Sequence, residues 1–521
     1  MPAESCGGSG VSGVRVAARA TSIAHAAREF VASRWAELAV GLLAAALYLP
    51  SIGYGFVFDD AALIAPDGSP LAVGGIVPYR PLRYASYLVD YALGGTPAIY
   101  HAHNVLLHAL VAALVVAVAR RLGSPRAAAM AGGLLVATHP LAVEAAAYVA
   151  GRRDLLCVAL GLCAVLMQLS GRFAMALVFV VLATAAKESG LVFIAPLAAA
   201  SIAGLDGRAA APRLRVFAAA GGMAAAAGIA AAVTSGLALA LAYGAIGPWA
   251  PAADAAGLAL PGRVLAHYLG ALVGAVPLSP EYPELLGFVA RLQGAEALAN
   301  SGITVLLAMV AAASLAACVR SGKRRRGREG AFVFAWTMAV VVALAVWGGL
   351  HEPGADRHAY LLLAPLGVAL AAVLSRLRLG DAAARKSRRA APALLRSAVV
   401  AGVILTLLGS ASASRRQMEI WRSERTLWTH ASADPSASPR AHANMARSLA
   451  RDGDYGAAVR HMNSALAADP SDPQLYLGRT AVRCAQQRRF HARRDLRRAR
   501  HLGASAPLVA ELVRDCGLGA L

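Results

Sequence analysis

The sequence has 521 residues, of which 58% are hydrophobic and only 15% are charged, and its mean hydropathy is +0.56. Soluble globular proteins average about 45–50% apolar and about 25% charged residues, so this chain lacks the polar side chains needed to cover a soluble fold. The net charge of +21 comes from arginines that stand in blocks between apolar stretches, which is typical of membrane-protein loops and argues against nucleic-acid binding.

Long apolar stretches run through most of the chain. A helix that crosses a bilayer needs about 20 mostly apolar residues, and segments of this kind predict about eleven to thirteen transmembrane helices. The predicted fold class is therefore all-α, a polytopic helical membrane protein. The candidate spans are residues 35–52, 103–120, 127–147, 154–170, 172–186, 189–204, 215–234, 235–252, 263–279, 301–319, 331–350, 358–374 and 397–413.

The arginine blocks predict the orientation. Residues 1–34 have no small-residue cleavage site after an apolar core, so we expect a cytoplasmic N-terminal segment and an uncleaved first helix. The blocks fall on every second loop, which predicts an odd number of spans and an outer location for everything after residue 413. That location is the periplasmic face of a bacterial inner membrane, or the lumenal face of the endoplasmic reticulum in a eukaryote. Cys484 and Cys516 can pair only if this region faces an oxidising compartment.

The composition changes at the end of the predicted membrane domain, 35–413. The segment 414–521 is polar and has helical periodicity. A roughly 34-residue unit that starts at Pro439 places small residues where the two helices of a tetratricopeptide repeat cross, and a weaker unit starts near Pro473. We therefore expect a short α-solenoid, the alternative being a generic amphipathic helix pair. Because each repeat contacts mainly its neighbours, we expect this domain to be separable from donor binding.

Ionisable side chains gather on loops that are predicted to share the outer face. Two adjacent carboxylates, Asp59 and Asp60, come just beyond the first span and are the candidate catalytic residues. Ionisable groups at membrane depth are costly and usually mark function. The candidates for donor or substrate binding are Tyr79, Arg80, His103, Asn104, His139, Glu144, Arg152, Arg153, Asp154, Lys187, Glu188 and Arg357.

These residue types suit transfer of a sugar from a lipid-linked phosphate. Arginine presents a planar fork to phosphate oxygens, and a carboxylate can take the proton of an incoming hydroxyl. Two adjacent carboxylates repel each other, so we expect the pKa of at least one to be raised. On an extended loop the two would also point in opposite directions. His139 precedes Pro140 and could instead cap a helix end. The spacing of His101 and His103 is a weak metal signal, so a divalent metal stays open.

The order of these motifs resembles a known family. FVFDD at 56–60, YRPL, HNVLLH, HPLAVEAAAYVAGRRDLL, AAKES, PLSPEYP and DRHAYLLLAPLG, followed by repeat units, are similar to the transmembrane and tetratricopeptide repeat-containing (TMTC) protein O-mannosyltransferases of the GT-C class. The resemblance covers roughly residues 35–505. It implies a GT-C-like membrane domain, a requirement for Asp59 and Asp60, and a sugar, mannose, carried on polyprenyl or dolichyl phosphate. Family members generally carry a longer repeat array than this chain.

The resulting hypothesis is an inverting glycosyltransferase that acts on Ser or Thr of protein acceptors. Two other functions stay open: a non-catalytic membrane scaffold whose repeats bind a partner protein, and a lipid-sugar flippase or transporter. The carboxylate pair favours the enzyme, because a scaffold has no need of ionisable groups at the outer face. A transporter should show paired broken helices or inverted repeats, and the sequence shows none clearly.

Overall fold

The computed structural model describes residues 33–71, 80–205, 255–282, 313, 325–350, 355–377 and 393–518. Every regular element in these ranges is a helix, and their β pairing is limited to an isolated bridge between Ile64 and Pro70. The prediction of an all-α fold is therefore confirmed for this part of the chain. Tyr79, nearly all of segment 1–34 and the candidate spans 215–234, 235–252 and 301–319 lie wholly or almost wholly outside the described residues.

Four described helices are long and apolar enough to cross a membrane. They are Ser33–Gly53, α3 (Pro97–Arg121), α15 (Asp356–Arg376) and Leu394–Ile420, the last forming nearly all of α16 (Ala393–Ile420). A fifth candidate is the pair Arg126–Thr138 (α4) and Pro140–Ala147, which bends by 58°. The bend falls at a proline, which cannot donate the backbone hydrogen bond that would continue the helix. The total number of spans stays a prediction.

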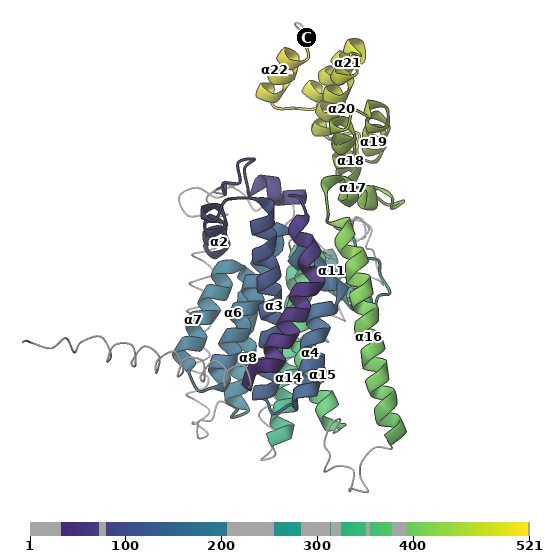
Figure 1. The fold of residues 1–521 in the computed structure, drawn as a ribbon. Coiled ribbons are helices and arrows are strands. Elements are labelled where there is room, and N and C mark those ends of the chain that lie inside the picture. Colours follow the sequence, from purple (N-terminus) through teal and green to yellow (C-terminus); the bar gives the residue numbers. More distant parts are fainter. Residues whose placement is uncertain are drawn as a thin grey trace, which may run out of the picture.

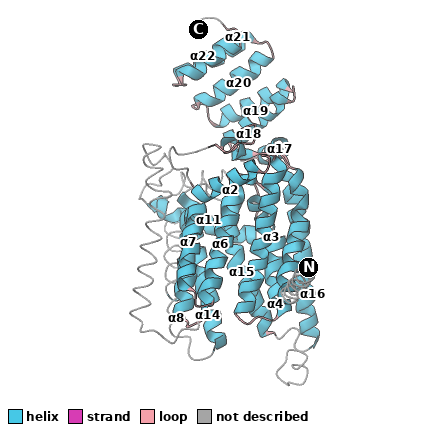
Figure 2. Ribbon diagram, turned by 60° about the vertical axis from the view of Figure 1, so that its left-hand side comes forward, coloured by secondary structure: helices cyan, strands magenta, loops and turns pink. Residues whose placement is uncertain are grey.

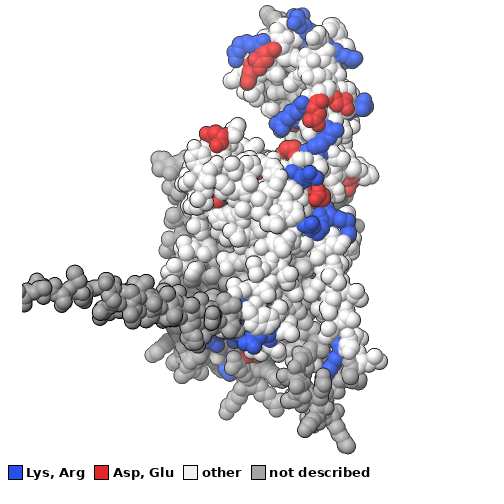
Figure 3. Space-filling model, in the orientation of Figure 1, with Lys and Arg blue, Asp and Glu red and all other residues white. Residues whose placement is uncertain are grey.

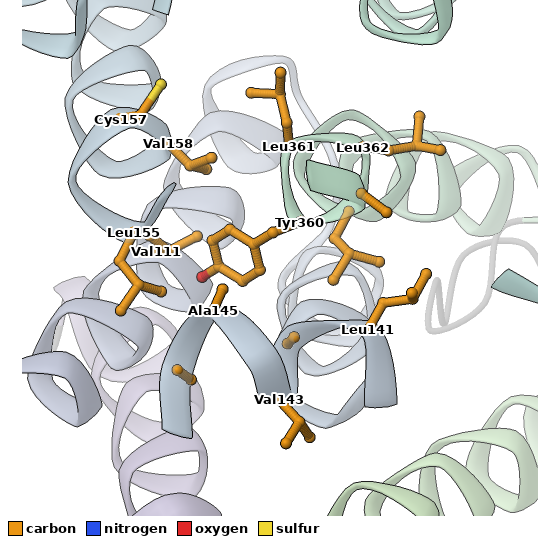
Figure 4. Packing of buried hydrophobic residues seen from close by; sticks show 14 of the residues in the cluster. Val111, Leu141, Val143, Ala145, Leu155, Cys157, Val158, Tyr360, Leu361 and Leu362 are labelled. Carbon is orange, nitrogen blue, oxygen red and sulfur yellow. The ribbon is translucent and has the colours of Figure 1, made fainter. Parts of the chain in front are cut away.

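The apolar core lies where α3, α4, α6 (Arg152–Leu169) and α15 pack together, and α7 (Phe173–Ala186) lies against α6 (Figures 1 and 2). Tyr360 of α15 points into this core beside Val111, Ala145 and Leu155 (Figure 4). Its hydroxyl lies 2.9 Å from Nδ1 of His108 on α3. Three more helices extend the bundle: α14 (Arg325–Leu350) packs against α15, and α8 (Ile194–Ile202) and α11 (Ala255–Leu272) pack against α14.

Glycines allow α4 and α15 to touch through their backbones. A Cβ on Gly132 of α4 would lie 2.2 Å from the carbonyl oxygen of Gly367 on α15, and a Cβ on Gly367 would lie 2.6 Å from that of Gly132. Small residues at such crossings are typical of helices that associate within a bilayer, where close packing rather than water exclusion holds them together.

Most of the surface of α16 before Ser414 is apolar and exposed. Leu394, Leu405 and Leu408 are 83%, 69% and 63% exposed, and no residue of its most apolar window is buried. On the face that Figure 3 shows, a broad uncharged surface separates the charged C-terminal helices from the charges at the opposite end. A helix of this length and apolarity is covered when acyl chains surround it, which supports a membrane location.

The C-terminal helices form stacked antiparallel pairs (Figure 1). They are α17 (Glu424–Ser432), α18 (Pro439–Arg451), α19 (Tyr455–Ala468), α20 (Pro473–Ala485), α21 (Arg489–His501) and α22 (Ala506–Asp515). Pro439 and Pro473 each follow a side-chain N-cap, Ser438 and Asp472. Proline is favoured at the first helical position because its missing N–H has no intrahelical partner there. These starts fit the roughly 34-residue period of tetratricopeptide repeats, an assignment that stays a prediction.

A disulfide stabilises the C-terminal helices, and a hydrogen bond fixes α16, the helix that precedes them, to the bundle. A disulfide joins Cys484, in α20, to Cys516, just after α22. Helix α16 continues without a break through the predicted domain boundary at residues 413 and 414, and the buried Ser414 hydroxyl donates to the carbonyl of Thr138 at 2.7 Å. The helix that packs against the bundle therefore continues to Ile420, and α17 begins soon after it, at Glu424.

Candidate functional site

The acidic pair lies on a short 3₁₀ helix, η2 (Phe58–Ala62), between the first helix and α2 (Pro81–Ala92). The chain at this point is helical rather than extended, so its side chains do not simply alternate. The two carboxylates nevertheless lie in different environments: Asp60 is fully buried, whereas the side chain of Asp59 is 36% exposed. The pair is therefore split by burial.

Asp60 fixes the loop to the bundle. Its Oδ2 accepts the backbone N–H of Val57 at 3.0 Å, and its Oδ1 accepts that of Ala150 at 2.9 Å. Burial raises the pKa of Asp60 to about 8, although both backbone donors favour the charged form. The expected rise of one pKa is confirmed, and its main cause is desolvation, with repulsion from Asp59 a smaller contribution.

Asp59 faces the C-terminal helices. Its Oδ1 accepts a hydrogen bond from Nη2 of Arg440, on α18, at 2.9 Å. Its backbone N–H donates to the hydroxyl of Tyr148 at 3.2 Å, which fixes the main chain but leaves the carboxylate accessible. Only this member of the pair combines a fixed backbone with an accessible carboxylate, as a general base requires.

A buried cluster of alternating charges lies at the start of α6. Ala150, whose N–H donates to Asp60, lies in η4 (Val149–Gly151). Helix α6 follows η4 directly and begins with Arg152, Arg153 and Asp154. The acidic pair and this cluster therefore lie at the same end of the bundle.

Each predicted cation in or near this cluster contacts a carboxylate. Arg80 forms a two-point pair with Glu188, through Nε at 3.0 Å and Nη2 at 2.7 Å. Lys187 contacts Asp154 through Nζ, and Nε of Arg153 lies 3.5 Å from the same acid. Two cations thus share Asp154.

Arg152 has more kinds of partner than the other cations: a carboxylate, an amide oxygen and an aromatic ring. Its guanidinium pairs with Asp90 of α2, donates to Oδ1 of Asn104 at 2.8 Å, and lies 4.9 Å from the ring centroid of Tyr87. Asp90 also accepts a hydrogen bond from Nδ1 of His103 at 2.8 Å when that nitrogen is protonated. These contacts give Arg152 the role of joining α2, α3 and α6.

Glu144 and Arg357 join the bent helix pair to α15. They form an ion pair, and Glu144 also accepts the backbone N–H of Arg357 at 2.9 Å. His139 caps the helical turn that starts at Pro140: its Nδ1 accepts the N–H of Leu141 at 3.2 Å, and its Nε2 lies 3.0 Å from the carbonyl oxygen of Leu272. His139 therefore has the structural role that the sequence left as an alternative.

The structure adds residues that the sequence motifs did not single out as site candidates. Asp90 is the counterion of Arg152, and Tyr148 orients the backbone of Asp59. Glu281 and Arg440 complete the surroundings of Asp59. Glu281 lies in the PLSPEYP motif, which was a signal, whereas no local pattern marks Arg440. Within the described ranges, no group of three or more His, Cys, Asp or Glu side chains lies together as a metal site would require.

Comparisons with known proteins agree on one enzyme class. No family model and no solved structure matches the chain. It is 39% identical over 134 residues to protein O-mannosyl-transferase Tmtc2 of Drosophila melanogaster, which covers 22% of this chain and 14% of that protein. It is 32% identical over 157 residues to protein O-mannosyl-transferase TMTC4 of Homo sapiens, which covers 24% of this chain and 21% of the relative. The chain thus spans a seventh to a fifth of the length of these curated relatives, and over that segment it is similar to TMTC protein O-mannosyl-transferases.

Proposed function

We propose that the protein is a membrane glycosyltransferase that transfers mannose from a polyprenyl- or dolichyl-phosphate donor to Ser or Thr hydroxyls of a protein acceptor. The observation that carries this proposal is the accessible carboxylate of Asp59, held at the same end of the bundle as a buried cation cluster. The similarity to proteins named O-mannosyl-transferases supports the reaction type.

The reaction is a single displacement at the sugar. The acceptor hydroxyl oxygen bonds to the anomeric carbon while the bond from that carbon to the phosphate oxygen breaks. The hydroxyl proton passes to the carboxylate of Asp59, and the electron pair of the broken bond leaves with the polyprenyl phosphate. One displacement inverts the anomeric centre. Asp60 is not the base in this proposal, because both of its oxygens already accept backbone hydrogen bonds.

The donor phosphate requires cationic side chains. Arg80, Arg153 and Lys187 lie at this end of the bundle beside Asp154 and Glu188. This concentration of cations supports phosphate binding beside the start of α6. Arg152 and Arg357 each have a carboxylate of their own, so we assign them to positioning these helices.

The polyprenyl chain requires apolar surface. A mostly apolar cavity of about 250 Å³ lies between the end of α11 and the last turns of α16, with Pro140, Leu278 and Ile420 in its wall. Its apolar lining supports binding of part of an isoprenoid chain, because close packing against apolar side chains can hold such a chain beside the bundle within the bilayer.

We further propose that 35–413 forms the membrane domain and that the C-terminal helices are tetratricopeptide repeats on the outer face. The bond between Cys484 and Cys516 supports this side, because disulfides persist in the periplasm and the endoplasmic reticulum lumen but are rare in the cytosol. Protein acceptors are delivered to the same face, where Asp59 lies against α18.

The experiment is a reconstitution with defined donors. Purified protein in proteoliposomes is given polyprenyl-phosphate mannose with a radioactive sugar, together with a Ser/Thr-rich acceptor peptide. We expect label on the peptide that mild alkali releases, as expected for an O-linked sugar, and none when a nucleotide-linked mannose replaces the lipid donor. Protein that inserts and folds but labels no peptide from the lipid donor would contradict the proposal and favour the scaffold.

A further inference from the structure

We propose that Arg440, on α18, is a positioning residue that holds the carboxylate of Asp59 in place for the acceptor hydroxyl. The inference rests on the proposed function and assigns part of the transfer site to the C-terminal helices.

The guanidinium of Arg440 joins three separate segments. Nη2 donates to Oδ1 of Asp59 at 2.9 Å, and Nε lies 3.3 Å from Oε1 of Glu281. The centre of the guanidinium lies 4.6 Å from the ring centroid of Phe58, the residue before the candidate base. Glu281 is fixed on its other oxygen by the hydroxyl of Ser438, the N-cap of the helix that carries Arg440.

Helix α17 fixes the backbone of Phe58, the residue before Asp59. The N–H of Phe58 donates to Oε1 of Glu424 at 2.6 Å, and the indole N–H of Trp428 donates to the same carboxylate. The Phe58 ring packs 5.6 Å from the Trp428 ring and 5.7 Å from the Tyr148 ring, measured between centroids. Trp428 is 1% exposed. Helix α17 therefore fixes the main chain, and Arg440 fixes the side chain that follows it.

Arg440 differs from an ordinary surface ion pair. Arg425 and Asp452, both in the C-terminal helices, also form an ion pair at 2.8 Å, but their side chains are 45% and 59% exposed. The side chain of Arg440 is itself 50% exposed, so the difference lies in its partners: it contacts two acids, of which Glu281 is only 15% exposed, and an aromatic ring. These several partners fix the orientation of the planar Arg440 guanidinium. An isolated exposed ion pair between long side chains, by contrast, contributes little to stability.

Fixing Asp59 matters for rate because a general base acts only within hydrogen-bond reach of the proton that it takes. A displacement of about 1 Å of a reacting group can cost about 10²-fold in rate. Without Arg440, the carboxylate of Asp59 loses its side-chain hydrogen bond from α18 and gains rotational freedom. The expected loss is therefore in kcat, with the KM of the lipid donor unchanged.

The test compares Arg440→Met and Arg440→Lys with Arg425→Met, which removes the exposed pair from the same helices. We expect kcat to fall about 10-fold to 10²-fold in Arg440→Met, at unchanged donor KM and thermal midpoint. Arg440→Lys should retain an intermediate kcat, and Arg425→Met should match the wild type. Millimolar methylguanidinium should restore part of the rate to Arg440→Ala, whereas sodium chloride at equal ionic strength should not.

Two results overturn the inference. A wild-type kcat in a folded Arg440→Met variant removes the positioning role, and an increased kcat means that Arg440 obstructs the base instead. If Arg440→Met does not fold, Arg440→Gln tests the same point, because it also removes the guanidinium that donates to Asp59 and should lower kcat in the same way. An inactive wild-type protein overturns the proposed function and this inference together, whereas an active one with unaffected variants overturns the inference alone.

Discussion

Asparagine in place of Asp60 should lower mainly the stability of the protein, whereas asparagine in place of Asp59 should lower mainly its activity. Asp60 has no exposed surface, and its two oxygens accept N–H groups from Val57 and Ala150 at 3.0 and 2.9 Å. Asparagine keeps the size of the side chain but has one acceptor oxygen. In Asp60→Asn one of the two N–H groups therefore faces an NH₂ group and loses its acceptor.

A buried donor without an acceptor costs about 1–3 kcal/mol. Asp59→Asn loses only the charge of a pair whose side chains are 36% and 50% exposed, and exposed pairs contribute about 0–1 kcal/mol. The structure thus predicts that Asp60→Asn lowers the stability of the protein several-fold more than Asp59→Asn does.

The assay is thermal unfolding of the purified variants in one detergent at about pH 5, well below the pKa of Asp60, where ionisation of the buried carboxyl does not lower the wild-type midpoint. Unfolding is followed by tryptophan fluorescence and by retention of the monodisperse peak after heating. We expect Asp59→Asn to unfold near the wild-type midpoint and Asp60→Asn clearly below it. Equal midpoints for the two variants, or a lower one for Asp59→Asn, would refute the assignment of Asp60 as the structural member of the pair.

Three further predictions follow from single features. Because folding raises the pKa of Asp60 from 3.8 to about 8, the stability that this group contributes is lost as pH rises from about 4 to 8, so the unfolding midpoint of the wild type should fall relative to that of Asp60→Asn over this range. Gly132→Ala should lower the midpoint, because its Cβ would lie 2.2 Å from a backbone carbonyl of α15, whereas Gly409→Ala, with no atom within 4 Å, should not. Reducing the bond between Cys484 and Cys516 should speed hydrogen exchange in α22 but not in α18, since closing a loop of this size contributes about 3–4 kcal/mol.

The sequence predicts elements that depend on local pattern. Apolar length placed the spans that the structure describes, such as 103–120 within Pro97–Arg121 and 358–374 within Asp356–Arg376. Proline at a helix start and small residues at helix crossings placed the C-terminal pairs near Pro439. These signals act over one helix turn or one helix length, so no tertiary contact is needed to recognise them.

The site depends on contacts that local pattern does not encode. The sequence indicated phosphate-binding arginines, but the partner of Arg152 is Asp90, which lies in another helix. The sequence also could not show which of Asp59 and Asp60 is the better candidate base. The two differ in burial, and burial depends on tertiary packing.

The expected separability of the C-terminal domain from donor binding stays a prediction, but this domain also contacts the candidate base. Separability was expected because each repeat contacts mainly its neighbours. Truncation after Ser414 would remove Trp428 and Glu424, which pack against Phe58 beside the candidate base. The structure therefore favours a C-terminal region that supports the transfer site.

The role of Asp59 as the base of a lipid-dependent sugar transfer can be tested by single-turnover kinetics with purified Asp59→Asn. The measurement follows radioactive mannose from a saturating polyprenyl-phosphate donor to an acceptor peptide, with donor binding determined on the same sample. If Asp59 is the base, the transfer rate should fall about 10²-fold to 10⁴-fold, with donor affinity and unfolding midpoint unchanged. A variant that binds the donor and transfers mannose at the wild-type rate would contradict this role.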